Sequence, residues 1–471
     1  MGKPRKPRKR TTYAQQTVVD IEHQGHGVVK PEGTVLFVED ALPGEVVDVL
    51  VTRKKRGHGF GVVEQYHERS PIRVEPFCPH FGTCGGCRWQ YLPYEKQLEY
   101  KEYFVRTIME RIGRVDDVEF LPILGCETDR RYRNKLDYSF TDSRWLSAEE
   151  IAEGGENLER RGVGFHVRGR FDRILNVETC HLQPEPSNEI RRAIRDATIA
   201  QDLSYYNPHR HDGWLRSLVI RTSTNGEVMV TVVFGSDDRR DVREEIFDLI
   251  AKRFPDVVSI NYIINTTLND SLGSHAVYLA RGRDFIVERC GDLNLRIHPR
   301  SFYQTNARQA ERLYAVVAEW AALSGRETVW DLYCGIGSIA LFLACSAGRV
   351  WGVETVAEAI DNAWENAREN DIPNVHFSVG DVKDALGAPP AEAGTPDLLV
   401  VDPPRMGLHP DVVAAIGALG VPRIIYVSCN PATQARDVQM LAERYRPVRC
   451  RPVDMFPQTH HIESVIELRL R

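Results

Sequence analysis

The chain has 471 residues, of which 42% are hydrophobic and 27% are charged, and its formal net charge is −6 at pH 7. This length exceeds one ordinary core, so we expect two or three domains. No apolar run approaches the roughly 20 residues of a membrane span, and the start lacks the apolar stretch of a signal peptide. We therefore expect a cytoplasmic monomer without a membrane partner. Its ten cysteines do not indicate disulfides, because the cytosol keeps thiols reduced.

The first residues are strongly basic although the whole chain is acidic. Six of the eight residues 3–10 are Lys or Arg, and none is acidic. Residues 1–11 are predicted to be a disordered tail, which is either simply solvated or an arm that pairs with phosphates.

Residues 12–70 are predicted to form a small β-barrel. Short β-like runs are broken by Gly and Pro turns at 31–33 and 43–44, and a second basic run occupies residues 53–56. The segment resembles the TRAM domain, an OB-like RNA-binding barrel. Barrels of this kind contact nucleic acid through a basic, partly aromatic face.

Three cysteines cluster directly after the predicted barrel. Cys78, Cys84 and Cys87 have the spacing C-x5-C-x2-C, with two glycines before the last. Three thiolates on such a bent loop can converge on one metal centre, and Cys180, which follows a strand-like run, is the best candidate for a fourth ligand. Four thiolates suit either zinc or an iron–sulfur cluster, and the spacing does not choose between them.

A helix is predicted over residues 93–113, because apolar side chains recur there at three- and four-residue steps. We expect this helix to pack on the C-terminal domain. Residues 71–92 and 114–289 are predicted to form a central α+β domain that holds the metal centre and contacts RNA. Alternating runs such as LRSLVIRTS and VMVTVVFG favour an antiparallel sheet with helices in this domain.

From residue 290 to 471, apolar strand-like runs alternate with helices, which predicts an α/β domain with a parallel, doubly wound, Rossmann-like sheet. The strand TVWDLYC leads into Gly335, Gly337 and Ser338, where a backbone can turn tightly and approach a ligand. The third glycine of the dinucleotide motif is missing. We therefore expect a smaller, positively charged adenosyl cofactor, with NAD as the alternative.

Three carboxylates follow the later strands of the predicted sheet. Glu354 ends the second strand, where a carboxylate can bind both hydroxyls of a ribose. Asp381 closes the third strand, in the place that usually meets the adenine amino group, and Asp402 closes the fourth. Because these strand ends share one edge of the sheet, the three residues are predicted to bind the cofactor.

Cys429 follows the strand RIIYV in the string SCNP, so it is predicted to stand at the carboxyl edge of the sheet beside the cofactor. A thiolate at this place suits methylation of uracil at carbon 5, because addition to carbon 6 turns the base into an enolate. A base must then remove the carbon 5 proton, and Glu463 is the candidate. His460 or His461 could relay that proton. The alternatives are a small buried thiol, a solvated carboxylate and surface histidines.

The strings DLYCGIGS, DPPRMGL, VSCNPAT and QTHHIESV together resemble the RumA/TrmA-type RNA uracil-5 methyltransferases over residues 300–471. The resemblance implies a class I methyltransferase domain that uses S-adenosylmethionine, with Cys429 as nucleophile and Glu463 as base. It also implies cofactor contacts by Gln304, Tyr333, Glu354, Asp381 and Asp402. Ser338 departs from those members that carry Asn at this position.

The resemblance also concerns the metal centre and the RNA. Members with a comparable distant cysteine carry a 4Fe-4S cluster, which implies iron–sulfur and not zinc on the four cysteines. Members with both a TRAM barrel and this cluster typically methylate 23S ribosomal RNA, so this RNA is the implied substrate, with tRNA as the alternative. Phe302 or Tyr333 could stack on the extruded base.

Other classes of protein fit these motifs less well. Asp402-Pro403-Pro404 also occurs in methyltransferases of exocyclic amines, but those carry an aromatic residue next, where this chain has Arg405. A DNA cytosine methyltransferase carries its cysteine in a Pro-Cys dipeptide, and radical enzymes show C-x3-C-x2-C with one open iron. A non-catalytic iron–sulfur RNA-binding protein would need neither Cys429 nor Glu463.

Overall fold

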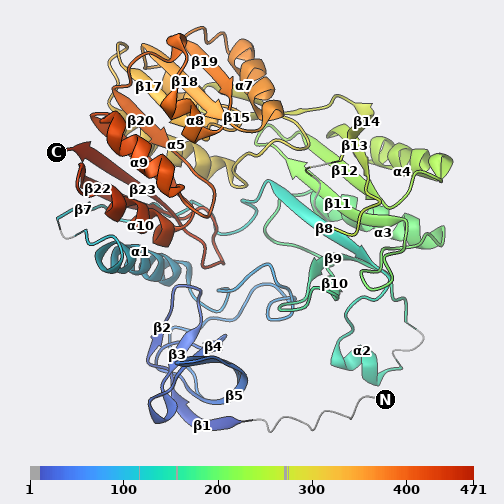
Figure 1. Ribbon diagram of the computed structural model, residues 1–471. Helices are drawn as coiled ribbons and strands as arrows, with labels where there is room; N and C mark the ends of the chain where they lie inside the picture. Colours follow the sequence, from blue (N-terminus) through green and yellow to red (C-terminus); the bar gives the residue numbers. More distant parts are fainter. Residues whose placement is uncertain (1–10, 116, 155–157, 270–272, 274) are drawn as a thin grey trace, which may run out of the picture.

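A computed structural model describes residues 11–115, 117–154, 158–269, 273 and 275–471. The predicted tail, except for residue 11, lies outside the described residues. Three bodies are built around a small N-terminal sheet, a central sheet and a larger C-terminal sheet (Figure 1). Among the described helices none is both long and apolar enough to cross a bilayer.

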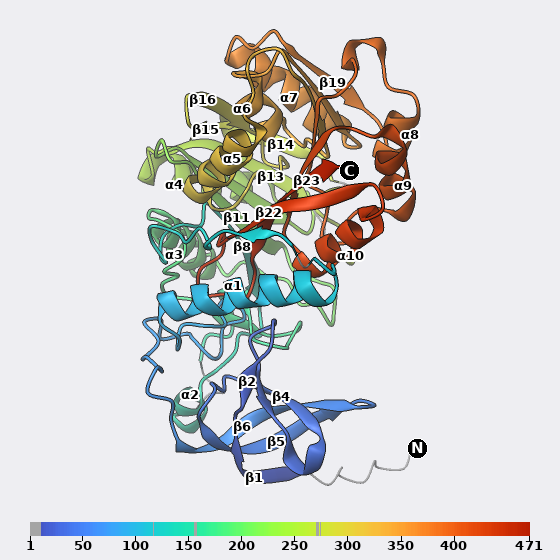
Figure 2. The ribbon, with the colours of Figure 1, turned by 90° about the vertical axis from the view of Figure 1, so that its left-hand side faces the viewer.

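The N-terminal sheet has six strands in the order β1-β5-β6-β4-β3-β2. Alternate residues of β4 and β5 are buried, which is the period-2 pattern of a strand with one face on a core. The sheet curls around a small apolar core that includes Val29, Leu36 and Val49 (Figure 2). The strands are β1 (Thr12–Thr17), β2 (Asp20–Ile21), β3 (Gly27–Val29), β4 (Val35–Glu39), β5 (Val46–Lys54) and β6 (His58–Glu68).

Helix α1 (Tyr94–Arg111) lies between the N-terminal sheet and the C-terminal body (Figure 2). It contacts α10 (Pro431–Leu441) and β22 (Tyr445–Val453). Val105 and Met109 are buried in the same apolar cluster as the C-terminal sheet. The apolar face of the helix is therefore covered by the C-terminal body.

The central sheet has seven strands in the order β10-β9-β8-β11-β12-β13-β14. Its pairs are antiparallel except β12–β13, which is parallel because α4 forms the crossover between these two strands. The expectation of a purely antiparallel sheet was wrong at this pair. The elements are β8 (Lys135–Thr141), α2 (Ala148–Ala152), β9 (Gly162–His166), β10 (Ile174–Asn176), α3 (Ser187–Ala200), β11 (Leu215–Thr222), β12 (Val228–Phe234), α4 (Arg240–Arg253), β13 (Val257–Ile264) and β14 (Val277–Gly282).

The C-terminal sheet has the order β19-β18-β17-β20-β21-β23-β22-β7. The five strands from β19 to β21 are parallel, and helices cover both faces with separate apolar clusters, which confirms the predicted doubly wound class. The expectation of a wholly parallel sheet was wrong at β23, which runs antiparallel to β21 because it returns directly from β22. The elements are α5 (Ala307–Ala321), β17 (Thr328–Leu332), α6 (Ser338–Ala344), β18 (Arg349–Glu354), α7 (Ala357–Glu369), β19 (Val375–Val379), α8 (Val382–Gly387), β20 (Leu398–Val401), α9 (Pro410–Leu419), β21 (Arg423–Ser428) and β23 (Glu463–Leu470).

Two short segments lie away from the divisions expected from the sequence. The hairpin of β15 (Ile286–Cys290) and β16 (Leu293–Ile297) spans residue 290 and packs on α5, α6 and α7. β7 (Glu119–Phe120) pairs with β22 at the edge of the C-terminal sheet, although the chain enters the central sheet only later. Both segments are placed by contacts with distant parts of the chain.

Candidate active site

A cavity of about 1510 Å³ lies between the carboxyl edge of the C-terminal sheet, the central sheet and the cysteine-rich segment. Its wall gathers most residues that the sequence singled out. They are Cys78, Cys84, Cys87, Cys180, Gln304, Tyr333, Gly335, Ser338, Glu354, Asp402, Cys429, His460, His461 and Glu463. Gly337 and Asp381 are not part of this wall.

The loop after β17 bends through left-handed backbone conformations. Gly335 and Gly337 have φ values of +54° and +81°, and Tyr333, between β17 and these glycines, has φ +66°. A Cβ at Gly337 would lie 3.0 Å from Phe377 and 3.2 Å from Ala363. Gly337 therefore serves close packing behind the loop, whereas the backbone at Gly335 faces the cavity.

Glu354, at the end of β18, holds this loop in place through a hydrogen bond to its backbone. Its Oε2 accepts a hydrogen bond from the Gly335 amide at 3.3 Å, and its Oε1 accepts from the Thr355 and Val356 amides at 2.7 and 3.1 Å. Burial raises the pKa of the Tyr333 hydroxyl to about 12, with smaller contributions from charges that include Asp381. Asp381 thus lies near Tyr333 but caps α8, where its side chain accepts from the Lys383 amide.

The wall beneath the loop is acidic. Asp331 in β17 is buried, and neither of its carboxyl oxygens has a hydrogen-bond partner among the described residues. Burial raises its pKa far above the ordinary value, and the neighbouring Asp402 raises it further. Burial also raises the pKa of Asp402 to about 7. Buried carboxyls without partners favour a cationic ligand. The sequence analysis missed Asp331, although a lone Asp within an apolar strand was a visible signal.

Cys429 stands directly after β21, before α10. Burial, with smaller contributions from the charges of Glu463 and Asp402, raises the pKa of its thiol to about 11. Arg405 opposes this shift of the pKa through its charge and a side-chain hydrogen bond. Asn430 donates to the Arg405 carbonyl at 3.0 Å and so ties the two loops together. From the sequence, Arg405 was noted only as the residue that stands where amine methyltransferases carry an aromatic side chain. In the structure it is a neighbour of the thiol.

Glu463 is the first residue of β23 and is only 2% exposed. Its Oε2 has no hydrogen-bond partner in the described part of the chain. Burial raises the pKa of this carboxyl well above its ordinary value, Asp402 adds to the shift, and Arg405 counters it. Cys429, Glu463, Asp402 and Arg405 therefore form one electrostatic group at the end of the cavity.

His460 and His461 precede this carboxyl, and their ring centroids are 4.3 Å apart. Burial lowers the pKa of His460 to about 3 and that of His461 to about 4, so both rings are neutral near pH 7. Nδ1 of His460 has no hydrogen-bond partner among the described residues. A neutral imidazole beside a carboxyl can accept and pass a proton.

The cavity wall also carries basic and aromatic side chains. Arg88, Arg133 and Arg405 line it, as does Phe302, whose side chain is 69% exposed. Acidic and basic side chains thus line one cavity. This combination suits a small cation together with a polyanion.

The four predicted metal-binding cysteines are half-buried free thiols on the same cavity wall. Burial raises the pKa of Cys84 to about 11 and that of Cys87 to about 12, and both receive contributions from Cys78 and Cys180. Each thiolate charge would repel the others, and a cation that binds sulfur would remove this repulsion. Within the described ranges, however, no three His, Cys, Asp or Glu side chains are arranged closely enough to hold a metal ion.

The five remaining cysteines contribute no second cluster of this kind. Cys290, Cys334 and Cys450 are buried, and Cys345 is exposed. Cys126 donates from its sulfur to the Asp454 carbonyl at 2.9 Å.

The doubly wound sheet, the glycine loop, the carboxylate at the end of the second strand and the acidic cavity define a class I methyltransferase. Comparison with family models agrees. Residues 323–418 match a methyltransferase domain, residues 395–471 match tRNA (Uracil-5-)-methyltransferase, and residues 17–63 match the TRAM domain. The N-terminal barrel predicted from the sequence is thereby confirmed.

Whole-chain relatives make the assignment more specific. Uncharacterized RNA methyltransferases of Bacteroides thetaiotaomicron and Porphyromonas gingivalis are 43% and 45% identical, over 95% and 96% of this chain and 99% and 98% of theirs. The crystal structure of Pyrococcus abyssi tRNA (uracil-54, C5)-methyltransferase with S-adenosyl-L-homocysteine is 29% identical, covers 96% of this chain and 99% of its own, and has a TM-score of 0.74. The chain belongs to the RNA uracil-5 methyltransferase family and is an S-adenosylmethionine-dependent enzyme.

Proposed function

We propose that this enzyme methylates carbon 5 of one uridine through a transient bond between Cys429 and carbon 6, with Glu463 as the base. The observation that carries the proposal is the buried Glu463 carboxyl, whose Oε2 has no described partner, beside the Cys429 thiol. A dry, unpaired carboxyl destabilises a fold. Its position beside a nucleophile therefore favours a role in the reaction.

The chemistry assigns a separate task to each of these side chains. Cys429 as thiolate bonds to carbon 6, and the ring electrons move onto the oxygen at carbon 4 as an enolate. Carbon 5 then takes the methyl group from the sulfonium as the carbonyl at carbon 4 forms again, and the electrons of the broken S–CH3 bond leave with neutral S-adenosylhomocysteine. Glu463 removes the carbon 5 proton, the electrons of that C–H bond restore the 5,6 double bond, and the carbon–sulfur bond breaks to return the thiolate.

Proton transfer around the thiol needs partners, because the pKa of Cys429 is about 11 in the ligand-free protein. Arg405 favours the thiolate through its positive charge. His460 and His461 are the proposed relay between Glu463 and solvent, since both rings are neutral and line the same cavity.

S-adenosylmethionine supplies the electrophilic methyl group when it is bound. We assign its adenosine end to Tyr333, Gly335 and Glu354, and its positively charged end to the acidic wall of Asp331 and Asp402. The unpaired, buried Asp331 carboxyl supports this orientation, because a sulfonium and an ammonium would neutralise the wall.

Three further cofactor residues have more specific proposed tasks. Gln304 and Ser338 line the cavity and are proposed to contact the cofactor directly. Asp381 is exposed and lies near Tyr333, and its proposed task is to meet the adenine amino group. Gly337 is proposed to shape the loop through its packing.

RNA is the polyanion that the arginines of the cavity wall suit, and the N-terminal sheet adds a second basic surface. Phe37 and Phe60 are cross-strand neighbours with centroids 5.7 Å apart. Arg53 faces Phe60 from the next strand, with its guanidinium carbon 4.3 Å from the ring centre, and the Lys55 ammonium is 5.7 Å away. Stacked aromatics with neighbouring cations bind single-stranded nucleic acid.

The proposed RNA is 23S ribosomal RNA, on the resemblance to methyltransferases that combine a TRAM barrel with a four-cysteine cluster. A second candidate is tRNA, because the similar Pyrococcus abyssi enzyme is a tRNA (uracil-54, C5)-methyltransferase that matches over nearly the whole chain. Phe302 is the proposed stacking surface for the extruded base in either case, because Tyr333, the alternative, is assigned to the cofactor.

We propose that Cys78, Cys84, Cys87 and Cys180 hold a 4Fe-4S cluster, with zinc as the alternative. Support comes from four free thiols on one wall and from the electrostatic coupling among them. Since the described cysteines do not form a closed metal site, ligand side chains must shift when the centre assembles. A saturated centre of four thiolates would join the two cysteine-bearing segments and stabilise this wall.

The test of catalysis uses RNA in which 5-fluorouracil replaces uracil. Fluorine cannot leave as a cation, so the reaction should stop as a covalent adduct that survives denaturing electrophoresis. Cys429→Ser should form no adduct, and Glu463→Gln should accumulate one with ordinary RNA. Turnover by Cys429→Ser at the wild-type rate would refute the nucleophile. Mapping 5-methyluridine after reaction with 23S ribosomal RNA and with tRNA identifies the substrate.

The metal centre is tested separately on anaerobically purified protein. About four iron and four sulfide per chain, with visible absorption that Cys87→Ser abolishes, is the expected result. One zinc per chain without iron would contradict the iron–sulfur cluster and support the zinc site. Cys345→Ser is the matched control, because Cys345 lies outside this group of thiols and should leave the metal content unchanged.

A further inference from the structure

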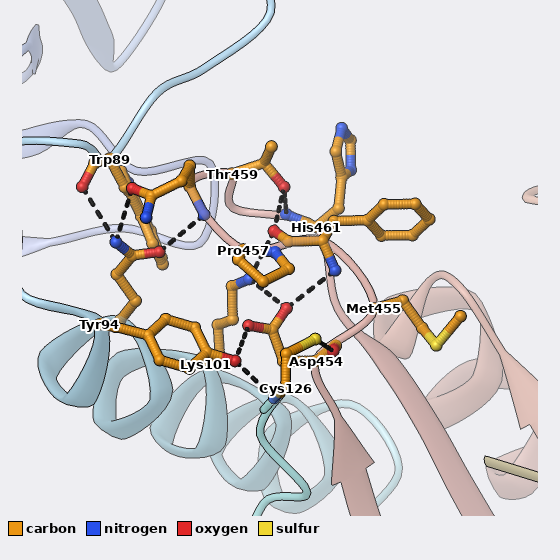
Figure 3. A network of polar contacts seen from close by, with 12 residues as sticks. Trp89, Tyr94, Lys101, Cys126, Asp454, Met455, Pro457, Thr459 and His461 are labelled. Carbon is orange, nitrogen blue, oxygen red and sulfur yellow. Dashed lines mark hydrogen bonds and ion pairs between the residues drawn. The ribbon is translucent and has the colours of Figure 1, made fainter. Parts of the chain in front are cut away.

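Residues 454–462 form the loop between β22 and β23 and contain no helix or strand. The loop leads directly to Glu463. Five successive carbonyls, from Asp454 to Gln458, are nevertheless each held by a group from another part of the chain. The donors are Cys126 Sγ to 454, Asn306 Nδ2 to 455, Lys101 Nζ to 456, Tyr132 Oη to 457, and the Arg88 and Trp89 amides to 458. Figure 3 shows the part of this network around Tyr94, Lys101, Cys126 and Asp454.

Gln458 is the most tightly held residue of the loop. Its φ is +67°, a left-handed conformation that residues other than glycine rarely adopt. Its backbone N–H donates to Gln97 Oε1 at 2.9 Å, and its Oε1 accepts from Gln97 Nε2 at 3.0 Å. Its Nε2 donates to Asp129 at 2.8 Å. Strained residues persist only where their surroundings determine them fully, and they concentrate at functional sites.

A buried ion pair holds the beginning of the loop. Lys101 Nζ lies 2.7 Å from Asp454 Oδ1, and both side chains have 0% exposure. Tyr94 donates to the second oxygen of Asp454 at 2.9 Å, and the Phe456 amide donates to the first at 3.0 Å. A buried ion pair contributes little net stability, since its desolvation offsets its attraction. The pair does, however, fix the register between α1 and the loop.

The geometry points to a positioning role for Gln97, Lys101, Asp454 and Gln458: we propose that this clamp from α1 aims Glu463 at the carbon 5 proton of the bound base. The inference rests on the proposed role of Glu463 as base. The Glu463 carboxyl has no described hydrogen bond on Oε2, so the side chain is not oriented by a partner at that oxygen. Its direction therefore depends on the backbone that carries it, and the clamp determines that backbone.

The clamp also connects the cysteine segment to the reacting end. The two amides that bind the Gln458 carbonyl belong to Arg88 and Trp89, the residues directly after Cys87. Gln97 Nε2 also donates to the Trp89 carbonyl at 3.1 Å. The segment that carries three of the four cysteines is thus bonded to the loop that carries the base.

The test separates positioning from a general structural role by the step that slows. In Lys101→Met/Asp454→Asn both charges are removed together, so no unpaired charge is left buried. We expect turnover to fall by about 10- to 100-fold, because a displacement of about 1 Å can slow a reaction about 100-fold. The KM for RNA should change less than about threefold. A covalent protein–RNA adduct that already carries the transferred methyl group should accumulate with ordinary RNA.

Three proteins accompany this variant. Lys96→Met is the matched control, since it makes the same substitution on α1 at a solvent-exposed Lys that pairs with Glu99, and it should react like wild type. Gln458→Gly keeps the loop's backbone bonds, removes the left-handed strain and deletes the side-chain bonds, so it tests the clamp should the double variant fail to fold. Glu463→Gln is the reference for adduct accumulation.

The outcomes are distinct. An adduct in the clamp variants and in Glu463→Gln, with normal thermal unfolding, supports the positioning role. Slow turnover in folded clamp variants without any adduct, or unchanged turnover, overturns the positioning role. Absence of the adduct from Glu463→Gln itself overturns the proposed base and not merely the clamp.

Discussion

Cys429 should react slowly with alkylating reagents until a cationic ligand enters the cavity. Burial, Glu463 and Asp402 raise the pKa of its thiol from 9.0 to about 11. At pH 8 a thiol of pKa 9 is about one-tenth thiolate, and one of pKa 11 about one-thousandth. Because the thiolate is the reactive form, Cys429 should be alkylated about 100-fold more slowly than an ordinary exposed thiol.

The assay is reaction with iodoacetamide followed by mass spectrometry of tryptic peptides. The peptide 424–436 contains Cys429 as its only cysteine, and exposed Cys345 is the internal reference. S-adenosylmethionine should accelerate the reaction relative to S-adenosylhomocysteine, which differs by lacking the methyl group and with it the sulfonium charge. Asp402→Asn should also accelerate it, because it removes a charge that raises the pKa of the thiol. Arg405→Met should slow it, since Arg405 lowers that pKa.

The reasoning would be refuted if ligand-free Cys429 reacted as fast as Cys345, with a pH midpoint at or below 9. Equal rates with S-adenosylmethionine and S-adenosylhomocysteine would refute the cationic-ligand argument alone, because the burial that raises the pKa would still be present.

Three further predictions concern stability and RNA binding. The folded state raises the pKa of Glu463, so the stability that this group contributes is present below pH 4.5 and is lost as pH rises. Glu463→Gln should therefore be more stable than wild type by roughly 1–3 kcal/mol at pH 8. In urea unfolding this difference in the free energy of unfolding should disappear at pH 4. Gly337→Ala should be more destabilising in the same assay than Gly335→Ala, because both adopt a left-handed φ but only Gly337 meets Phe377 and Ala363; equal losses would contradict the packing role. Arg53→Ala/Lys55→Ala should lower the slope of log affinity against log salt by about 1.4 for single-stranded RNA, measured by fluorescence anisotropy, and an unchanged slope would exclude this surface.

Most of the chemistry was readable from the sequence because it stands at the ends of strands. Cys429 follows β21, Glu354 ends β18, and the glycine loop follows β17. Parallel strands bring their carboxyl ends to one edge, so local strings sufficed to predict that these residues meet. The cofactor type followed from the short glycine loop in the same way.

Strand direction was less predictable. An apolar run has the same period whichever way it runs, so the sequence did not show that β13 runs parallel to β12 or that β23 runs antiparallel to β21. The connection decides the direction: a helix crosses between β12 and β13, whereas β22 leads directly into β23.

The sequence by itself determined the class of enzyme and its glycine loop, and it predicted Cys429 and Glu463 as the reacting pair, since each of these features lies in a short contiguous string. Only the tertiary structure decided that Asp331 is buried near Asp402, that Arg405 lies beside the thiol, and that Lys101 holds Asp454 across 353 positions of the chain. Such facts depend on what the rest of the fold places around a side chain. The burial of a side chain and the charges around it depend on residues that are distant in the sequence. A short sequence pattern therefore cannot predict them.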